Sequence, residues 1–154
     1  MLYLKLFNMK CQADIQQLAE EKLKDAECLF ENKKYNSAYY IAGYVIELLL
    51  KAKVCKNLGI DNLFDFENNK QNTWKADNNL NRSFKVHDYA QLLLLSGLYP
   101  YFEIENRDVK FKTHWSIICQ WNEGARYLTG KTETDTKEFI TSVKEIKQWI
   151  QNHL

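Results

Sequence analysis

Apolar residues recur at three- and four-residue steps along most of the chain, and polar residues fill the positions between them. This spacing places the apolar side chains on one face of a helix. It predicts long helices over residues 13–32, 36–58, 113–127 and from 135 onward. A shorter helix is predicted over residues 88–96, with single helical turns at 62–66 and within 98–106, and a polar, asparagine-rich loop over 67–85. The pattern therefore predicts an all-α protein, an up-down helical bundle of four long helices plus one or two short ones.

The predicted helix over residues 36–58 is apolar over more than half of its circumference, which indicates a central place in the bundle. Glu47 and Lys51 stand four residues apart on it, in the favourable order for a helical ion pair. Because a carboxylate is costly to bury without a partner, the two residues form either a structural ion pair or part of a polar site between helices. Gly43 lies inside the same helix, where glycine costs about 1 kcal/mol relative to alanine. We expect another helix to approach closely there.

Composition and charge narrow the class of protein. The 154 residues are 45% hydrophobic and 27% charged, with a net charge of +1. These values are typical of a soluble globular domain and exclude a broadly basic surface for nucleic acid. We expect one bundle domain over residues 13–154, preceded by an arm over 1–12, and no membrane span. The four cysteines follow neither metal-ligand nor disulfide spacing, so we expect a cytoplasmic protein with reduced thiols, no metal and no cofactor.

The segment from Tyr35 to Ala52 resembles a helix of the HEPN domain family (higher eukaryotes and prokaryotes nucleotide-binding). It carries the family's Tyr-x-x-Ala, Ala-Gly, Glu and Leu-Lys-Ala elements at the family's spacing. His87-Asp88 opens a helix as in the family's His-Asp-Leu signature, although Tyr89 replaces the leucine, and Arg126-Tyr127 stands near the end of the predicted fourth helix. The resemblance covers residues 14–152.

This resemblance implies a homodimer and frequent pairing with a minimal nucleotidyltransferase in a prokaryotic toxin–antitoxin or defence module. It implies an interaction module that binds RNA or a nucleotide without catalysis of its own. The candidate binding residues are Glu47, Lys51, Arg126 and Tyr127, of which the last two would contact a phosphate or a partner in the groove of the bundle. The alternative for Arg126 is a position near a helix C-terminus, where the helix dipole favours a cation.

Many members of the family are metal-independent endoribonucleases with an arginine four to six residues before a histidine, and Arg107, Asp108 and His114 are similar to that motif. A histidine can transfer the proton, and an arginine can hold phosphate oxygens, while the 2′-hydroxyl of RNA attacks its own phosphate. This alternative requires both side chains to converge on one accessible cleft, facing the partner of a homodimer. Otherwise His114 only flanks a packed aromatic face. Arg82 and His87 also meet the loose spacing, without the Asp, Asn or His that often follows the arginine.

Overall fold

The structure is a computed structural model that describes residues 12–59 and 86–154, and these residues form helices and turns with no strand. The elements are α1 (Gln12–Glu31), α2 (Tyr35–Leu58), α4 (Tyr89–Leu95), α5 (Tyr99–Glu105), α6 (Val109–Ile118), the 3₁₀ helix η2 (Glu123–Tyr127) and α7 (Glu133–Gln151). The predicted all-α class is confirmed. The arm up to residue 11, the helical turn at 62–66 and the loop over 67–85 lie outside the described residues. The predicted domain boundaries stay a prediction.

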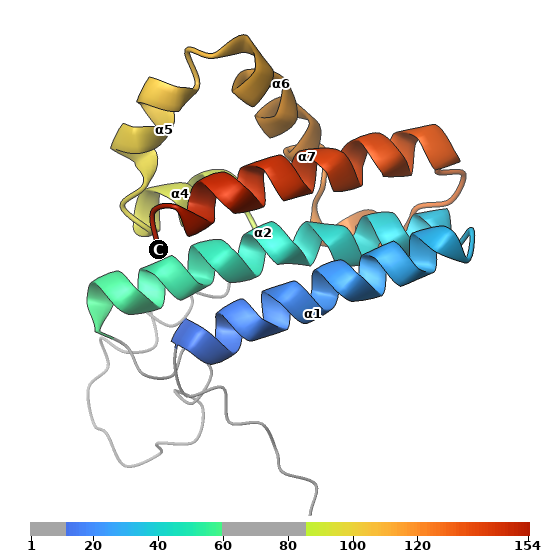
Figure 1. The fold of residues 1–154 in the computed structure, drawn as a ribbon, viewed down its shortest axis with the longest axis horizontal. Coiled ribbons are helices and arrows are strands. Elements are labelled where there is room, and N and C mark those ends of the chain that lie inside the picture. The colour runs from blue at the N-terminus through green and yellow to red at the C-terminus, as the bar shows by residue number, and fades with distance from the viewer. Residues whose placement is uncertain (1–11, 60–85) are drawn as a thin grey trace, which may run out of the picture.

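Three long helices, α1, α2 and α7, form the body of the bundle (Figure 1). The α2 helix lies between the other two, and fourteen of its 24 residues are buried. The α1 helix runs antiparallel to α2, while α7 runs in the same direction as α2, as expected for the second and last helices of an up-down bundle. The α2 helix is apolar around most of its circumference because α1 and α7 cover it on two sides.

Local hydrogen bonds decide where the helices begin and end. Gly59 ends α2 with a φ of 61°, the left-handed conformation that glycine adopts without strain. Asp88 begins α4, because its side chain accepts a hydrogen bond of 2.9 Å from the backbone N–H three residues on. Thr132 and Asp135 form a reciprocal capping box at the start of α7. The sequence pattern placed this helix start near Asp135, so the observed helix begins slightly earlier than predicted.

The predicted fourth long helix over residues 113–127 is wrong, since the structure has α6 followed by the separate turn η2. The α6 helix begins earlier because Asp108 caps it, accepting a hydrogen bond of 2.8 Å from the N–H of Phe111. It ends earlier because Trp121 turns into the core, where the residue is only 4% exposed and its indole N–H donates to the Tyr40 carbonyl. The described residues therefore hold three long helices rather than four.

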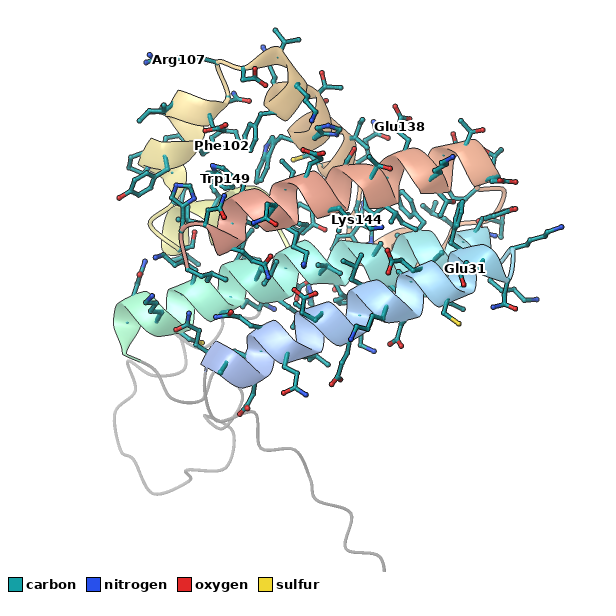
Figure 2. All side chains as sticks on the ribbon, viewed as in Figure 1. Glu31, Phe102, Arg107, Glu138, Lys144 and Trp149 are labelled. Carbon is teal, nitrogen blue, oxygen red and sulfur yellow. The ribbon has the colours of Figure 1, made fainter. Side chains whose placement is uncertain are left out.

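The end of α4, the α5 helix and the start of α6 form a projecting corner above α7, which we call the α5–α6 corner (residues 94–112; Figure 1). Pro100 lies in the first turn of α5, where its fixed φ suits a helix start. The ring of Phe102 packs 4.8 Å from Trp115 and 6.5 Å from Trp149, in the space between α5 and α7 (Figure 2). None of the seven α5 residues is buried by the described parts of the chain. The corner is thus joined to the bundle mainly through aromatic side chains.

Candidate functional site

The Glu47–Lys51 pair lies in the centre of α2 and is buried. The two residues are 3% and 6% exposed, and the lysine Nζ lies 2.6 Å from one carboxylate oxygen of Glu47. The other carboxylate oxygen lies 2.9 Å from Nδ1 of His87, which stands just before α4. The pair is therefore an ion pair that also holds a histidine from another segment. The structural ion pair expected from the sequence is present, while a binding role for Glu47 and Lys51 stays a prediction.

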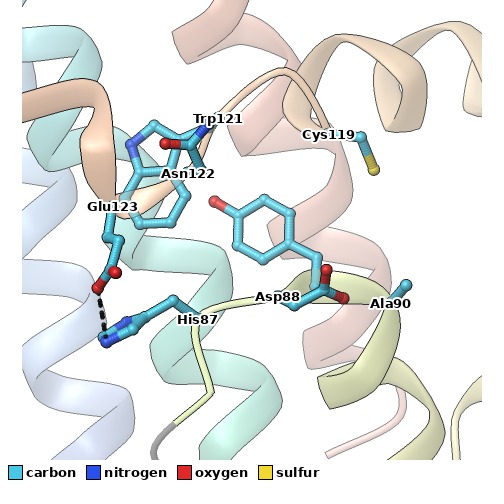
Figure 3. Close-up of a pocket in the computed structure, with 8 residues that line it drawn as sticks. His87, Asp88, Ala90, Cys119, Trp121, Asn122 and Glu123 are labelled. Atoms are coloured by element: carbon cyan, nitrogen blue, oxygen red, sulfur yellow. Dashed lines mark ion pairs between the residues drawn. The ribbon is translucent and has the colours of Figure 1, made fainter.

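His87 continues this arrangement toward the surface. Its Nε2 lies 3.1 Å from Oε2 of Glu123 on η2, and the same oxygen lies 3.8 Å from a guanidinium nitrogen of Arg126 (Figure 3 shows the His87–Glu123 contact). We call the residues Lys51, Glu47, His87, Glu123 and Arg126 the His87 ion chain. A carboxylate oxygen therefore lies close to each ring nitrogen of His87.

Aromatic side chains form the wall beside the His87 ion chain. The indole of Trp121 lies against Gly43, where an added Cβ would stand only 2.1 Å from a ring carbon. The Tyr89 ring stacks on this indole at 5.5 Å, and its hydroxyl donates to the Gly43 carbonyl at 2.6 Å. Burial, followed by the charge of Glu47, raises the pKa of Tyr89 well above its ordinary value. The glycine expected to admit a helix admits a tryptophan side chain instead.

A cavity of about 380 Å³ opens beside this wall (Figure 3). Its lining combines the outer part of the His87 ion chain with the aromatic wall and the cap of α4: His87, Asp88, Tyr89, Ala90, Cys119, Trp121, Asn122 and Glu123. Burial raises the pKa of the Cys119 thiol to about 11, and the charge of Asp88 adds to this shift. The thiol is therefore a poor nucleophile near neutral pH.

A second cavity, of about 250 Å³, lies between α6 and α7 and is lined in part by His114, Asp108 and Trp149. Nδ1 of His114 lies 3.0 Å from the Ser142 hydroxyl, so a side chain of α7 holds the ring. Arg107 does not line this cavity: it is exposed in the turn between α5 and α6, and its side chain points away from the bundle (Figure 2). Within one protomer, the structure does not bring Arg107 and His114 into one cleft.

The structure brings Glu47, Lys51 and Arg126 into one chain of contacts, which runs through two residues that sequence reasoning did not select. His87 was visible as part of a helix start and in the loose Arg82–His87 spacing, and nothing in the sequence pointed to Glu123. Tyr127 is not part of the His87 ion chain. The residue is 80% exposed, and its ring lies 5.5 Å from the Arg126 guanidinium. Arg82 lies outside the described residues.

Among residues 12–59 and 86–154, no group of three or more His, Cys, Asp and Glu side chains is placed to hold a metal ion. No helix in the same residues is both long enough and apolar enough to cross a lipid bilayer.

The family model for the HEPN domain matches residues 14–62, which include most of α1 and all of α2. The matched residues contain Gly43 and the buried pair of Glu47 and Lys51, so they hold the inner half of the His87 ion chain. No curated protein and no solved structure matches the chain. The matched helices and the all-helical architecture of the described residues agree, and they support a HEPN domain assignment that residues 14–62 carry.

Proposed function

We propose that this chain is a HEPN interaction module that binds RNA or a nucleotide and forms a homodimer. We further propose that it works in a toxin–antitoxin or defence pair with a minimal nucleotidyltransferase. The observation that carries the proposal is the α5–α6 corner. Six of the nine large apolar side chains that are exposed among the described residues lie within it: Leu94, Leu95, Tyr99, Tyr101, Ile104 and Val109. Such a concentration of exposed apolar surface is typical of a protein interface.

Charge favours a second copy of this chain as the partner at the corner. Glu103 and Glu105 lie on α5, whereas Lys110 and Lys112 lie at the start of α6, so acid and base occupy opposite arms of the corner. A twofold axis through the corner would place the acidic arm of one protomer against the basic arm of the other. The exposed Ile104 and Val109, at the tip of the corner, would lie near that axis.

The homodimer is tested by sedimentation equilibrium at micromolar concentration. We expect a dimer for the wild type and a monomer for Ile104→Glu, which places a charge in the proposed interface. Leu128→Glu is the matched control. Leu128 is an exposed aliphatic residue of the same size as Ile104, but it follows η2 and lies outside the corner. A monomeric wild type, or equal dissociation by both variants, contradicts the proposed interface.

The binding function is tested by fluorescence anisotropy with a labelled ten-nucleotide RNA and with a labelled ATP. The pairing with a nucleotidyltransferase is tested with a minimal nucleotidyltransferase encoded beside this chain. That protein should raise the melting temperature by mass action if it binds the folded state. Absence of RNA binding, nucleotide binding and any such shift would leave no support for the module.

A second candidate function is a metal-independent endoribonuclease that uses Arg107 and His114 across the homodimer. Two observations favour it: Arg107 lies on the proposed interface, and the Ser142 hydroxyl holds the His114 ring beside a cavity. An arginine reaching from the partner protomer could then hold the phosphate of RNA at that cavity. The 2′-hydroxyl would lose its proton to the His114 ring as its oxygen attacks the phosphorus. The bond between the phosphorus and the 5′-oxygen would break, the 5′-oxygen would take that proton from the ring and leave as a hydroxyl, and a 2′,3′-cyclic phosphate would remain.

Cleavage of a labelled RNA in the presence of EDTA tests this second function. We expect 2′,3′-cyclic phosphate ends for the wild type and the loss of cleavage in His114→Ala and Arg107→Ala. His153→Ala is the matched control, since that histidine lies at the end of the chain with its Nδ1 bonded to the Trp149 carbonyl. Equal cleavage by the wild type and His114→Ala removes the catalytic role of His114.

A further inference from the structure

One carboxylate oxygen of Glu123 lies close to both the His87 ring and the Arg126 guanidinium. This oxygen, Oε2, lies 3.1 Å from Nε2 of His87 and 3.8 Å from Nη2 of Arg126. The arginine is held in addition by its own helix, because its Nε donates to the Glu123 backbone carbonyl at 3.1 Å. An anionic oxygen placed between a histidine ring and a guanidinium has the surroundings that phosphate oxygens have in protein sites. The Glu123 side chain thus occupies an anion site made by two other residues.

The buried residues of the His87 ion chain, Glu47 and Lys51, support the His87 side of this site. Glu47 is 3% exposed and accepts from Nδ1 of His87, which fixes the ring and directs Nε2 outward. Lys51 neutralises Glu47 at 2.6 Å, so the buried carboxylate adds no net negative charge beneath the ring. A buried, neutralised carboxylate that orients a surface histidine is a support for a ligand-binding nitrogen.

Glu123 itself is placed to move. Its side chain is 51% exposed, whereas the His87 and Arg126 side chains that it contacts are 38% and 45% exposed. A rotation of the Glu123 side chain into solvent therefore uncovers both cations without breaking a buried contact. The remaining carboxylate at the cavity, Asp88, is occupied as the cap of α4. With Glu123 turned away, the charges of His87, Arg126 and Asp88 sum to one positive charge when the ring is protonated.

We propose that His87 and Arg126 form a binding site for a phosphate group and that Glu123 is its internal competitor, which must swing away before the phosphate binds. This inference rests on the proposed binding of RNA or a nucleotide, and it names the contact and its regulation. The phosphate could belong to an RNA backbone or to a free nucleotide. Both sources present the same oxyanion to the two cations.

Glu123→Gln in the full chain is the decisive variant, because it removes the competing charge and keeps the size of the side chain. Anisotropy is measured with a 3′-fluorescein-labelled oligouridine in one arm and a fluorescent ATP in the other, with inorganic phosphate as competitor. We expect Glu123→Gln to bind about tenfold more tightly, because the Glu123 carboxylate no longer competes with the phosphate for His87 and Arg126. Tightening in only one arm identifies the source of the phosphate.

Glu27→Gln is the matched control for charge. Glu27 is an exposed glutamate of α1, with 39% of its side chain accessible, and it pairs with Lys144 of α7 outside the site. We expect it to change affinity less than twofold, since an exposed charge is screened beyond about 10 Å at ordinary ionic strength. In the Glu123→Gln background, His87→Gln and Arg126→Gln should each remove the gained affinity.

The outcomes separate the two proposals. If the wild type binds RNA or ATP but Glu123→Gln and Glu27→Gln bind equally well, the internal competitor is refuted while the binding module stands. If His87→Gln and Arg126→Gln leave the gain intact, the phosphate does not bind between these two cations. If neither the wild type nor Glu123→Gln binds either probe, both the phosphate site and the proposed binding function fail. Circular dichroism and urea midpoints for each variant show that the compared proteins are folded.

Discussion

Replacing Gly43 by alanine should destabilise the protein, although alanine is the better helix former. The added Cβ would stand 2.1 Å from a Trp121 ring carbon, whereas ordinary contacts begin near 3.4 Å, so the indole must move by at least 1.3 Å. That movement disturbs the hydrogen bond from the indole to the Tyr40 carbonyl and the stacking on Tyr89. Overpacking costs about 2 kcal/mol and the lost hydrogen bond about 1 kcal/mol, while alanine returns about 1 kcal/mol of helix propensity. The expected net loss is about 2 kcal/mol.

Urea unfolding of a double-mutant cycle isolates this contact. Trp121→Ala alone should cost about 3–5 kcal/mol, because it removes a large buried side chain. In that background the space beside residue 43 is free, and Gly43→Ala should stabilise by about 1 kcal/mol. The substitution therefore changes sign between the two backgrounds, with a coupling of about 3 kcal/mol. An equal effect of Gly43→Ala in both backgrounds would refute the indole as the reason for the glycine.

Three further expectations concern the buried pair, the free thiol and the cap of α7. Lys51→Met should lower the free energy of unfolding by about 3–5 kcal/mol, since it leaves Glu47 buried without its cation, and a smaller loss than 1 kcal/mol in urea unfolding would contradict this. Cys119, whose pKa burial raises to about 11, should react with iodoacetamide at a rate that still climbs at pH 10, and a plateau near pH 9 by mass spectrometry would contradict that shift. Hydrogen bonds from Thr132 lower the pKa of Asp135, so its stabilisation is present above the unfolded carboxyl pKa and is lost as the pH falls through the lower folded value. Asp135→Asn should therefore be less stable than the wild type at pH 7 but equally stable at pH 2, and an unchanged difference at pH 2 would exclude the cap as its cause.

The long helices could be predicted from the sequence because their signals are local. The predicted ranges 13–32 and 36–58 agree with α1 and α2 to within one residue at each end, since apolar periodicity and Gly59 act within a few turns. The helix expected over 113–127 failed for a tertiary reason. The Trp121 side chain packs against Gly43 in the core instead of continuing the helix. The spacing of apolar residues in the sequence cannot reveal this contact, because it depends on the packing of distant segments.

In the candidate site too, contacts between residues close in sequence could be predicted and contacts between distant residues could not. Glu47 and Lys51 could be paired from sequence because they stand one turn apart on one helix. Glu123 could not be paired with His87, because the two residues lie far apart in the sequence. Glu123 begins the 3₁₀ helix η2, whereas His87 stands just before the short helix α4. The Arg107–His114 spacing would place both on one helix face, yet Arg107 lies before the Asp108 cap, so helical geometry does not apply to it.

The α2 helix and the α5–α6 corner differ in local stability against unfolding. Backbone amides in α2 are covered by α1 and α7, so their exchange with deuterium requires the whole bundle to open. Amides in α5, a helix with no buried residue within the described parts of the chain, can exchange through a local opening that leaves those three helices folded. A binding partner can therefore reshape the corner at the cost of that local opening alone, while the histidine and its buried carboxylate keep their positions.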